Sequence, residues 1–166
     1  MKRACTEEQV NIRKEEIINT VSKMFDEMDY QNISMKTISE KISIARSSLY
    51  CYYNSKEEIM LDVLKNDYIK FLKTIIEDFE KKDTIEELTD NITDAYMNNL
   101  RVMKIISLYL TDIEIHCSLG SLVNFKKDFV TYMLDLKKSI CKRFNNIPEK
   151  ESLIIYNSLL MLTHSL

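Results

Sequence analysis

The 166-residue sequence contains one glycine, one proline, no tryptophan and two histidines. Hairpins and tight turns use glycine and proline repeatedly, so a fold rich in β-sheet is not expected. We find no Ser/His/Asp order, no glycine-rich phosphate loop and no HExxH motif, the materials from which most hydrolytic and nucleotide-dependent sites are built. These absences argue against an enzyme.

The four cysteines, Cys5, Cys51, Cys117 and Cys141, form no CxxC pair. His116 stands beside Cys117, but neighbouring residues on a helix point about 100° apart and rarely hold one metal ion together. We therefore expect neither a metal nor a cofactor. Free thiols suit a reducing cytosol better than a disulfide framework. With no signal-peptide core and no stretch of 18 apolar residues, the sequence predicts a cytoplasmic protein.

Apolar residues make up 45% of the chain and charged residues 30%. Leu, Ile, Lys, Glu and Met dominate long stretches and recur at helical spacing, which predicts an all-α fold. The expected helices lie at about residues 8–28, 35–42, 45–53, 56–82, 84–100, 102–117, 122–145 and 148–166.

Capping residues place several of these helix ends. Ser55 with Glu58, and Thr84 with Glu87, have the spacing of a capping box, in which each side chain satisfies a free backbone N–H of the first turn. The first pair opens a long helix that joins the two halves of the chain. Gly120 is expected to end the helix before it, because glycine commonly follows the last helical turn.

Residues 34–53 have the pattern of a helix-turn-helix. This motif needs a small residue where its two helices cross, apolar side chains facing inward and a tight turn. Ser34 caps the first helix, Ser39 is the small residue and Ser43 lies at the turn, where a positive φ costs about 1 kcal/mol. The residues expected to face inward are Ile38, Ile42, Ile44 and Leu49.

The outward face of the second helix then carries groups that suit a DNA groove. An arginine can bind guanine with two hydrogen bonds, and hydroxyl groups can bind phosphates or base edges. Lys36 and Lys56 flank this face and suit phosphates. Four basic residues and one acid give residues 31–56 a charge of +3, although the whole chain carries −3. The residues on the outward face are Arg46, Ser47, Ser48, Tyr50 and Tyr52.

Two segments, Ile33–Ser39 (ISMKTIS) and Leu49–Ile59 (LYCYYNSKEEI), together resemble the signature of the tetracycline-repressor (TetR) family. That signature is roughly Thr-Ser/Thr-hydrophobic-Arg/Lys-x-Ile-Ala, followed by Leu-Tyr-x-x-Phe-x-Ser-Lys-Glu-x-Leu. The match covers about residues 10–65. It implies a helix-turn-helix DNA-binding domain over residues 1–55 and a helical effector-binding and dimerisation domain over residues 56–166.

By position, the resemblance assigns base contacts to the five outward residues of the second helix and phosphate contacts to Ser34, Lys36 and Lys56. Three residues depart from the family pattern. Asp29 and Ser43 replace usual glycines, and Ala45 stands where Ser or Thr commonly caps the second helix, which loses about 1 kcal/mol. None of the three removes a DNA-facing group, so they bear on rigidity more than on binding.

The resemblance also implies a small-molecule pocket enclosed by the helices between about residues 84 and 145. Met adapts its shape and Tyr offers a polar tip, which suits an apolar or aromatic effector. Each candidate also reads as an ordinary core residue. The pocket candidates are Tyr96, Met97, Met103, Tyr109, Phe125, Phe129, Tyr132 and Met133.

The last helices are implied to pair two subunits. Residues 152–166 are more apolar than a solvent-exposed helix should be, and His164 is expected at the subunit interface. A two-fold dimer would set two recognition helices about 34 Å apart, one turn of DNA. The apolar run reaches Leu166 without a stop signal, so we read this end as abrupt and consistent with truncation.

The sequence thus predicts a transcriptional regulator, a repressor that binds a palindromic operator as a homodimer and is released by a small molecule. The alternative is a TetR-like coactivator or scaffold that works through protein contacts without binding an operator. The presence of Arg46, Tyr50 and Lys56 favours the first hypothesis. The effector, the operator, the sign of regulation and the strength of the dimer are open.

Overall fold

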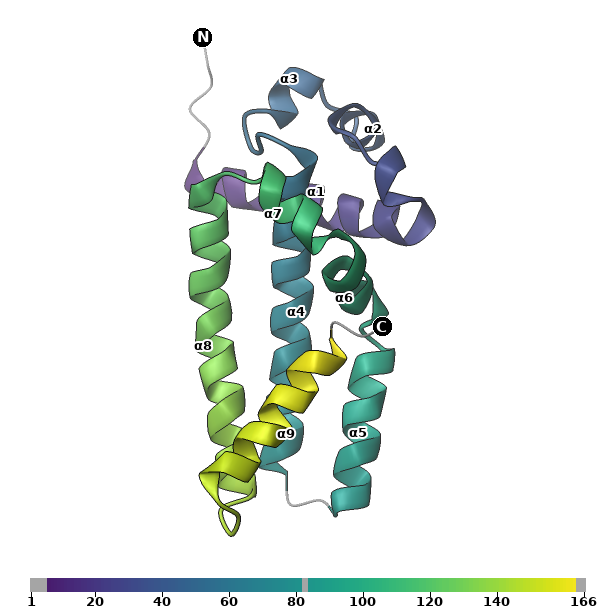
Figure 1. Cartoon of the computed structure of the whole chain (residues 1–166). Helices are drawn as coiled ribbons and strands as arrows, with labels where there is room; N and C mark the ends of the chain where they lie inside the picture. The colour runs from purple at the N-terminus through teal and green to yellow at the C-terminus, as the bar shows by residue number, and fades with distance from the viewer. Residues whose placement is uncertain (1–5, 82–83, 164–166) are drawn as a thin grey trace. The chain divides into compact units, whose positions relative to one another are not determined.

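The fold was examined in a computed structural model that describes residues 6–81 and 84–163 (Figure 1). These residues form helices and no strand, so the all-α prediction is confirmed. None of the described helices is long and apolar enough to cross a lipid bilayer. The elements are α1 (Glu7–Glu27), η1 (Tyr30–Asn32), α2 (Met35–Lys41), α3 (Arg46–Leu49), α4 (Lys56–Glu80), α5 (Ile85–Met97), α6 (Leu100–Lys104), η2 (Ile105–Tyr109), α7 (Leu110–His116), α8 (Leu119–Arg143) and α9 (Glu149–Leu162).

The chain divides into two compact units. The first unit comprises the described residues up to Val63 together with Asp112–Ser121, and the second comprises Leu64–Thr111 and the described residues from Leu122 onward. Helix α4 gives its first two turns to the first unit and its remainder to the second. The domain boundary expected near residue 55 stays a prediction.

In the first unit, α1 supplies the longest buried face. Thr6 and Gln9 form a capping box that starts this helix, and apolar residues three and four positions apart then fall on one side. The chain continues through η1 into the short helices α2 and α3, from which Ile38 and Leu49 are fully buried. The buried residues of α1 are Ile17, Val21, Met24 and Phe25.

In the second unit, the remainder of α4 packs beside α5 and α8, and α9 crosses them obliquely (Figure 1). Aromatic contacts hold these helices together. The Tyr68 ring of α4 lies 4.8 Å from that of Phe129 on α8, and the Phe71 ring lies 4.9 Å from that of Tyr96 on α5. The Tyr96 hydroxyl donates to the carbonyl oxygen of Leu159 in α9 at 2.5 Å. Contacts between aromatic side chains therefore help to hold the helices of the second unit together.

The prediction that Gly120 ends a helix is wrong. Helix α7 ends at His116, and Gly120 lies in the first turn of α8 without a positive φ. The Ser118 hydroxyl accepts the backbone N–H of Ser121 at 3.3 Å. This side-chain bond satisfies a free donor of the new helix, so α8 begins before the glycine and not after it.

Two further expectations need correction. The expected helix over 45–53 is only the four residues of α3, because the chain tightens after Leu49 and Tyr52 donates to the Leu49 carbonyl at 3.0 Å. The expected helix over 102–117 begins at Leu100 and contains a π-helical turn, η2, before α7. A π turn takes up an extra residue, and no sequence signal marks it here.

The turn between α2 and α3 depends on Ser43, the one non-glycine residue in the described chain with a positive φ, at 57°. Ser43 donates its N–H to the Glu40 carbonyl at 3.2 Å, and Ile44 donates to the Ser39 carbonyl at 3.0 Å. The left-handed conformation that the sequence predicted at Ser43 is confirmed. It closes the turn tightly enough for α2 and α3 to contact each other.

Replacing Ser43 by glycine should raise the free energy of unfolding by about 0.5–1 kcal/mol. A non-glycine residue in this conformation costs about 1–2 kcal/mol, and glycine recovers that while losing about 0.5–1 kcal/mol of chain entropy. Chemical denaturation measures the change. Ser22→Gly, inside α1, is the matched control and should lower stability by about 0.5 kcal/mol, because glycine is a poorer helix former than serine. Equal losses in both variants would contradict the strained turn.

Candidate nucleic-acid interface

Helix α2 is positioned by its first turn. The Ser34 hydroxyl accepts the N–H of Thr37 at 3.2 Å, and the Thr37 hydroxyl accepts the N–H of Ser34 at 2.9 Å. Ser34 is therefore the N-cap that the sequence predicted. Further along, Ser39 is buried with its hydroxyl on the Lys36 carbonyl at 2.8 Å, so a small, satisfied side chain occupies the crossing with α3.

Helix α3 presents a polar face to solvent. Its inward anchor is Leu49, which is fully buried. Arg46, Ser47 and Ser48 are all exposed. The Arg46 guanidinium donates from Nη2 to the Tyr50 hydroxyl at 3.1 Å, and its central carbon lies 5.6 Å from the centre of the Tyr50 ring. Arg46 and Tyr50 thus form one exposed surface that combines a guanidinium group with an aromatic ring.

The residues that flank α3 differ in their exposure and in their contacts within the chain. Lys36 is exposed and its ammonium lies 4.0 Å from the Glu40 carboxylate, a surface pair of little strength. Tyr52 is half-buried beyond the end of α3. Lys56 donates from Nζ to the Tyr30 carbonyl at 3.1 Å and lies 4.0 Å from the Tyr30 ring centre. Their contacts with DNA remain predictions, and Lys56 already has an intramolecular partner.

The segment after α3 is held by residues that the sequence did not single out. Tyr53 is buried, and its hydroxyl donates to the Asp62 carboxylate at 2.8 Å. Burial and the Asp62 charge raise the pKa of the Tyr53 hydroxyl well above its usual range. The Lys14 ammonium lies 4.9 Å from the Tyr53 ring centre. Tyr53 contacts Asp62 and Lys14, which are 9 and 39 positions away in the sequence. No local sequence pattern predicts contacts at such separations.

The capping box expected at Ser55 is formed only in part. The Ser55 hydroxyl accepts the Glu58 N–H at 3.2 Å, but the Glu58 carboxylate turns to the N–H of Asn54 at 3.0 Å and to its side-chain amide at 3.1 Å. The other Glu58 oxygen accepts from Ser118 N–H at 3.4 Å and the Ser121 hydroxyl at 3.0 Å. One buried carboxylate therefore joins three segments of the first unit.

Residues 17–63 match the model of the bacterial regulatory proteins of the tetR family. The match contains α2, the turn, α3 and the first two turns of α4. In this N-terminal region the chain is similar to the TetR family. Similar proteins are named as HTH-type transcriptional regulators, and α3 lies within the matched range.

The chain is 36% identical over 62 residues to the HTH-type transcriptional regulator YxbF of Bacillus subtilis, covering 37% of this chain and 16% of that protein. It is 28% identical over 75 residues to IcaR of Staphylococcus epidermidis, the negative transcriptional regulator of the biofilm operon icaADBC, covering 45% and 40%. The chain thus spans less than half the length of these relatives. Sequence likeness is confined to part of the chain.

The fold is similar over a longer range. A TetR/AcrR-family transcriptional regulator of Thermobifida fusca superposes with a TM-score of 0.62 at 16% identity, covering 91% of this chain and 81% of that one. At such low identity the likeness concerns the fold alone. The similarity in fold covers most of the chain and is not limited to the N-terminal region.

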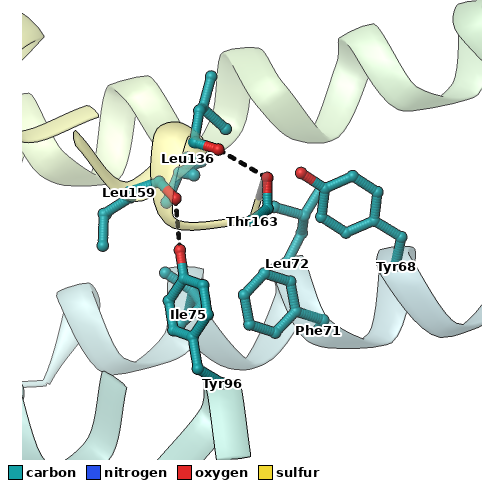
Figure 2. Close-up of a pocket in the computed structure, with 9 residues that line it drawn as sticks. Tyr68, Phe71, Leu72, Ile75, Tyr96, Leu136, Leu159 and Thr163 are labelled. Carbon is teal, nitrogen blue, oxygen red and sulfur yellow. Dashed lines mark hydrogen bonds between the residues drawn. The ribbon is translucent and has the colours of Figure 1, made fainter. Parts of the chain in front are cut away.

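The second unit contains a small cavity of about 10 Å³ (Figure 2), close to the lower limit for one water molecule. Aromatic rings from α4 and α5 and the last turn of α9 surround it. The Tyr96 hydroxyl is occupied by the Leu159 carbonyl, and burial raises the pKa of Tyr68 to about 12 against a hydrogen bond from Thr163. The lining residues are Tyr68, Phe71, Leu72, Ile75, Tyr96, Leu136, Leu159, Leu160 and Thr163.

Of the eight pocket candidates from the sequence, Tyr96 lines this cavity. Met103, Phe125 and Met133 are buried elsewhere in the second unit, Met97 is exposed, and Tyr109, Phe129 and Tyr132 are half-buried. The expected interface residue His164 lies outside the described residues. No group of three or more His, Cys, Asp or Glu in the described chain is arranged to hold a metal ion.

Glu58 should make the first unit sensitive to acid. Burial raises the pKa of its carboxyl, but hydrogen bonds from Ser118, Asn54 and Ser121 outweigh this and leave the pKa below the ordinary value of 4.5. A lowered folded-state pKa adds stability that is complete above the unfolded value and is lost as the pH falls through the folded one. The melting temperature should therefore fall below pH about 4.5 partly because of Glu58.

Glu58→Gln tests this linkage, because the amide cannot be protonated in this range. The variant should be less stable than the wild type at pH 7, and the difference should shrink as the pH falls from 5 to 3. Melting temperatures measured over that range provide the comparison. A difference that stays constant with pH would show that the Glu58 charge does not contribute.

Proposed function

We propose that this chain is a transcriptional regulator that binds double-stranded DNA through the exposed face of α3, acting in the cytoplasm where bacterial DNA lies. The observation that carries the proposal is the Arg46–Tyr50 pair, exposed together with Ser47 and Ser48 on a helix fixed by buried Leu49. An arginine held in this way can donate two hydrogen bonds to a guanine in the major groove, and neighbouring hydroxyls suit phosphates.

The regulator acts as a homodimer on a palindromic site. Helices α8 and α9 support this, because both carry large apolar side chains exposed to solvent. A monomer rarely leaves so many apolar residues uncovered on two helices, and a two-fold partner would cover them. These exposed residues include Leu119, Val123, Val130, Leu134, Ile154 and Met161.

A small apolar or aromatic molecule releases the regulator from DNA by binding near the cavity of the second unit. Aromatic rings line that cavity, with two tyrosine hydroxyls and one threonine as its polar groups. The effector must bind the released form more tightly than the DNA-bound form, because only a difference in affinity shifts the equilibrium. The action is repression, as the name of the relative IcaR as a negative regulator suggests.

Selection of bound DNA from a random pool tests this function and should recover one palindromic sequence. When binding to the selected sequence is measured, Arg46→Ala should cost about 1–3 kcal/mol of binding free energy and relax the preference at one base position. Lys36→Ala, an exposed residue outside α3, should weaken binding to all sequences alike and lower the salt slope by about one.

These two variants control for each other, because each removes one positive charge from the first unit. Recovery of no enriched sequence at 50 mM salt, where phosphate contacts are strongest, would reject DNA binding. Identical losses, specificities and salt slopes for the two variants would leave DNA binding intact but refute the assignment of Arg46 to a base.

Light scattering should give twice the monomer mass of 19.6 kDa at micromolar concentration. Leu134→Glu places a charge on the apolar face of α8 and should raise the dimer dissociation constant roughly tenfold or more. Leu108→Glu, at a leucine that is more exposed than Leu134 and lies outside α8 and α9, should leave the mass unchanged. A wild-type monomer at that concentration would contradict the dimer.

A further inference from the structure

One segment of the first unit comes from the middle of the chain. Residues Asp112–Ser121, from α7 to the first turn of α8, belong to the unit that carries α2 and α3, although they lie about 60 positions beyond α3. Ile113 of this segment is fully buried. We call Asp112–Ser121 the brace.

The first attachment of the brace is at Tyr30. This residue is buried, and its hydroxyl donates to the Asp112 carboxylate at 3.0 Å. The same Tyr30 holds Lys56 through its carbonyl oxygen and its ring. The hydrogen bond with Asp112 therefore also fixes Tyr30 as the partner of Lys56. Tyr30 precedes α2, so this attachment lies on the N-terminal side of the helix-turn-helix.

The second attachment is at Glu58. Its carboxylate accepts from Ser118 and Ser121 of the brace with one oxygen and from Asn54 with the other. Asn54 belongs to the turn that follows α3. The two attachments thus stand on either side of the helix-turn-helix, one before α2 and one after α3, and together they fix both of its ends.

The two attachments consist of few hydrogen bonds. The Asp112 side chain is 48% exposed, so its hydrogen bond from Tyr30 contributes modestly in the presence of solvent. Glu58 is buried, but only two of its four hydrogen bonds come from the brace. These hydrogen bonds can break while Ile113 stays in the buried core of the first unit. Regions held in this way supply the low-energy openings of folded proteins.

Both ends of the brace continue directly into the second unit. Its N-terminal end follows η2, whose π-helical turn is a point where a helix can change register, and Ser107 of that turn donates to the Thr163 carbonyl at 3.4 Å. Its C-terminal end continues into α8. A change of packing in the second unit therefore reaches the brace along the chain.

We propose that the brace regulates DNA affinity: with both attachments made, the helix-turn-helix is held in its binding form, and release of the attachments lowers affinity. This inference rests on the DNA binding proposed above and adds the device that controls it. Asp112 and Ser121 are positioning residues in this device, since they act through Tyr30 and Glu58.

The test measures DNA dissociation constants by fluorescence anisotropy for Asp112→Ala, Ser121→Ala and the double variant. Each single change should weaken binding about three- to tenfold, the range that one net hydrogen bond supplies. The double variant should lose little more than either single variant, because a brace released at one end no longer holds. The salt slope should stay that of the wild type, since no phosphate contact is removed.

Asp90→Ala is the matched control, an exposed acid on α5. Removing any acid reduces repulsion from DNA, so electrostatics alone predicts equal or tighter binding for both aspartate variants. The brace predicts weaker binding for Asp112→Ala only. Tyr30→Phe, which keeps the ring beneath Lys56, tests the same attachment if Asp112→Ala unfolds early.

Wild-type binding separates the two levels of the proposal. If the wild type fails to bind DNA, the proposed function falls and the brace falls with it. If the wild type binds and the Asp112, Ser121 and Tyr30 variants bind equally well, DNA binding stands and the brace is refuted. If the losses of binding free energy in the two single variants add up in the double variant, the two attachments act independently, and the brace is likewise refuted.

Discussion

The close crossing of α2 and α3 is the constraint on which the rest of the first unit depends. A four-residue helix has no stability of its own, because forming the first turn costs more than one hydrogen bond returns. Tertiary contacts hold α3 instead: Leu49 is fully buried, Ser39 leaves room at the crossing, and Ser43 adopts a left-handed turn. Leu49 anchors this short helix from beneath, while Arg46 and Tyr50 are both exposed. The exposed surface proposed to bind DNA thus depends on the packing beneath it.

Charge is distributed in keeping with this arrangement. The chain carries a net −3, yet two acids near α3 are tied into hydrogen bonds rather than spread over its surface. Asp62 accepts from Tyr53, and Glu58 is buried among four donors. These carboxylates stabilise the turn after α3 while Arg46 remains exposed. A mildly acidic protein can in this way present a locally basic face.

Local signals were readable from the sequence, and distant contacts were not. The caps at Ser34 and Thr84 and the positive φ of Ser43 follow from neighbouring residues, and each is found where it was predicted. Helix α3 ends earlier than predicted, and Tyr53 in the segment after it is buried against Asp62, nine positions further on. Lys56 contacts Tyr30, which is 26 positions away in the sequence, and Tyr30 contacts Asp112, which is 82 positions away. No periodicity or capping pattern contains such information, so the brace was invisible at that level.

The cavity was missed for a different reason. Its candidates were chosen by residue type within the helices after α4, and α4 was treated as a connecting rod; yet Tyr68 and Phe71 of α4 form much of the wall. That placement has a physical consequence. A space of about 10 Å³ cannot hold an organic effector. The proposed effector would therefore have to separate α4 from α5 or α9 and break contacts such as that of Tyr96 with Leu159.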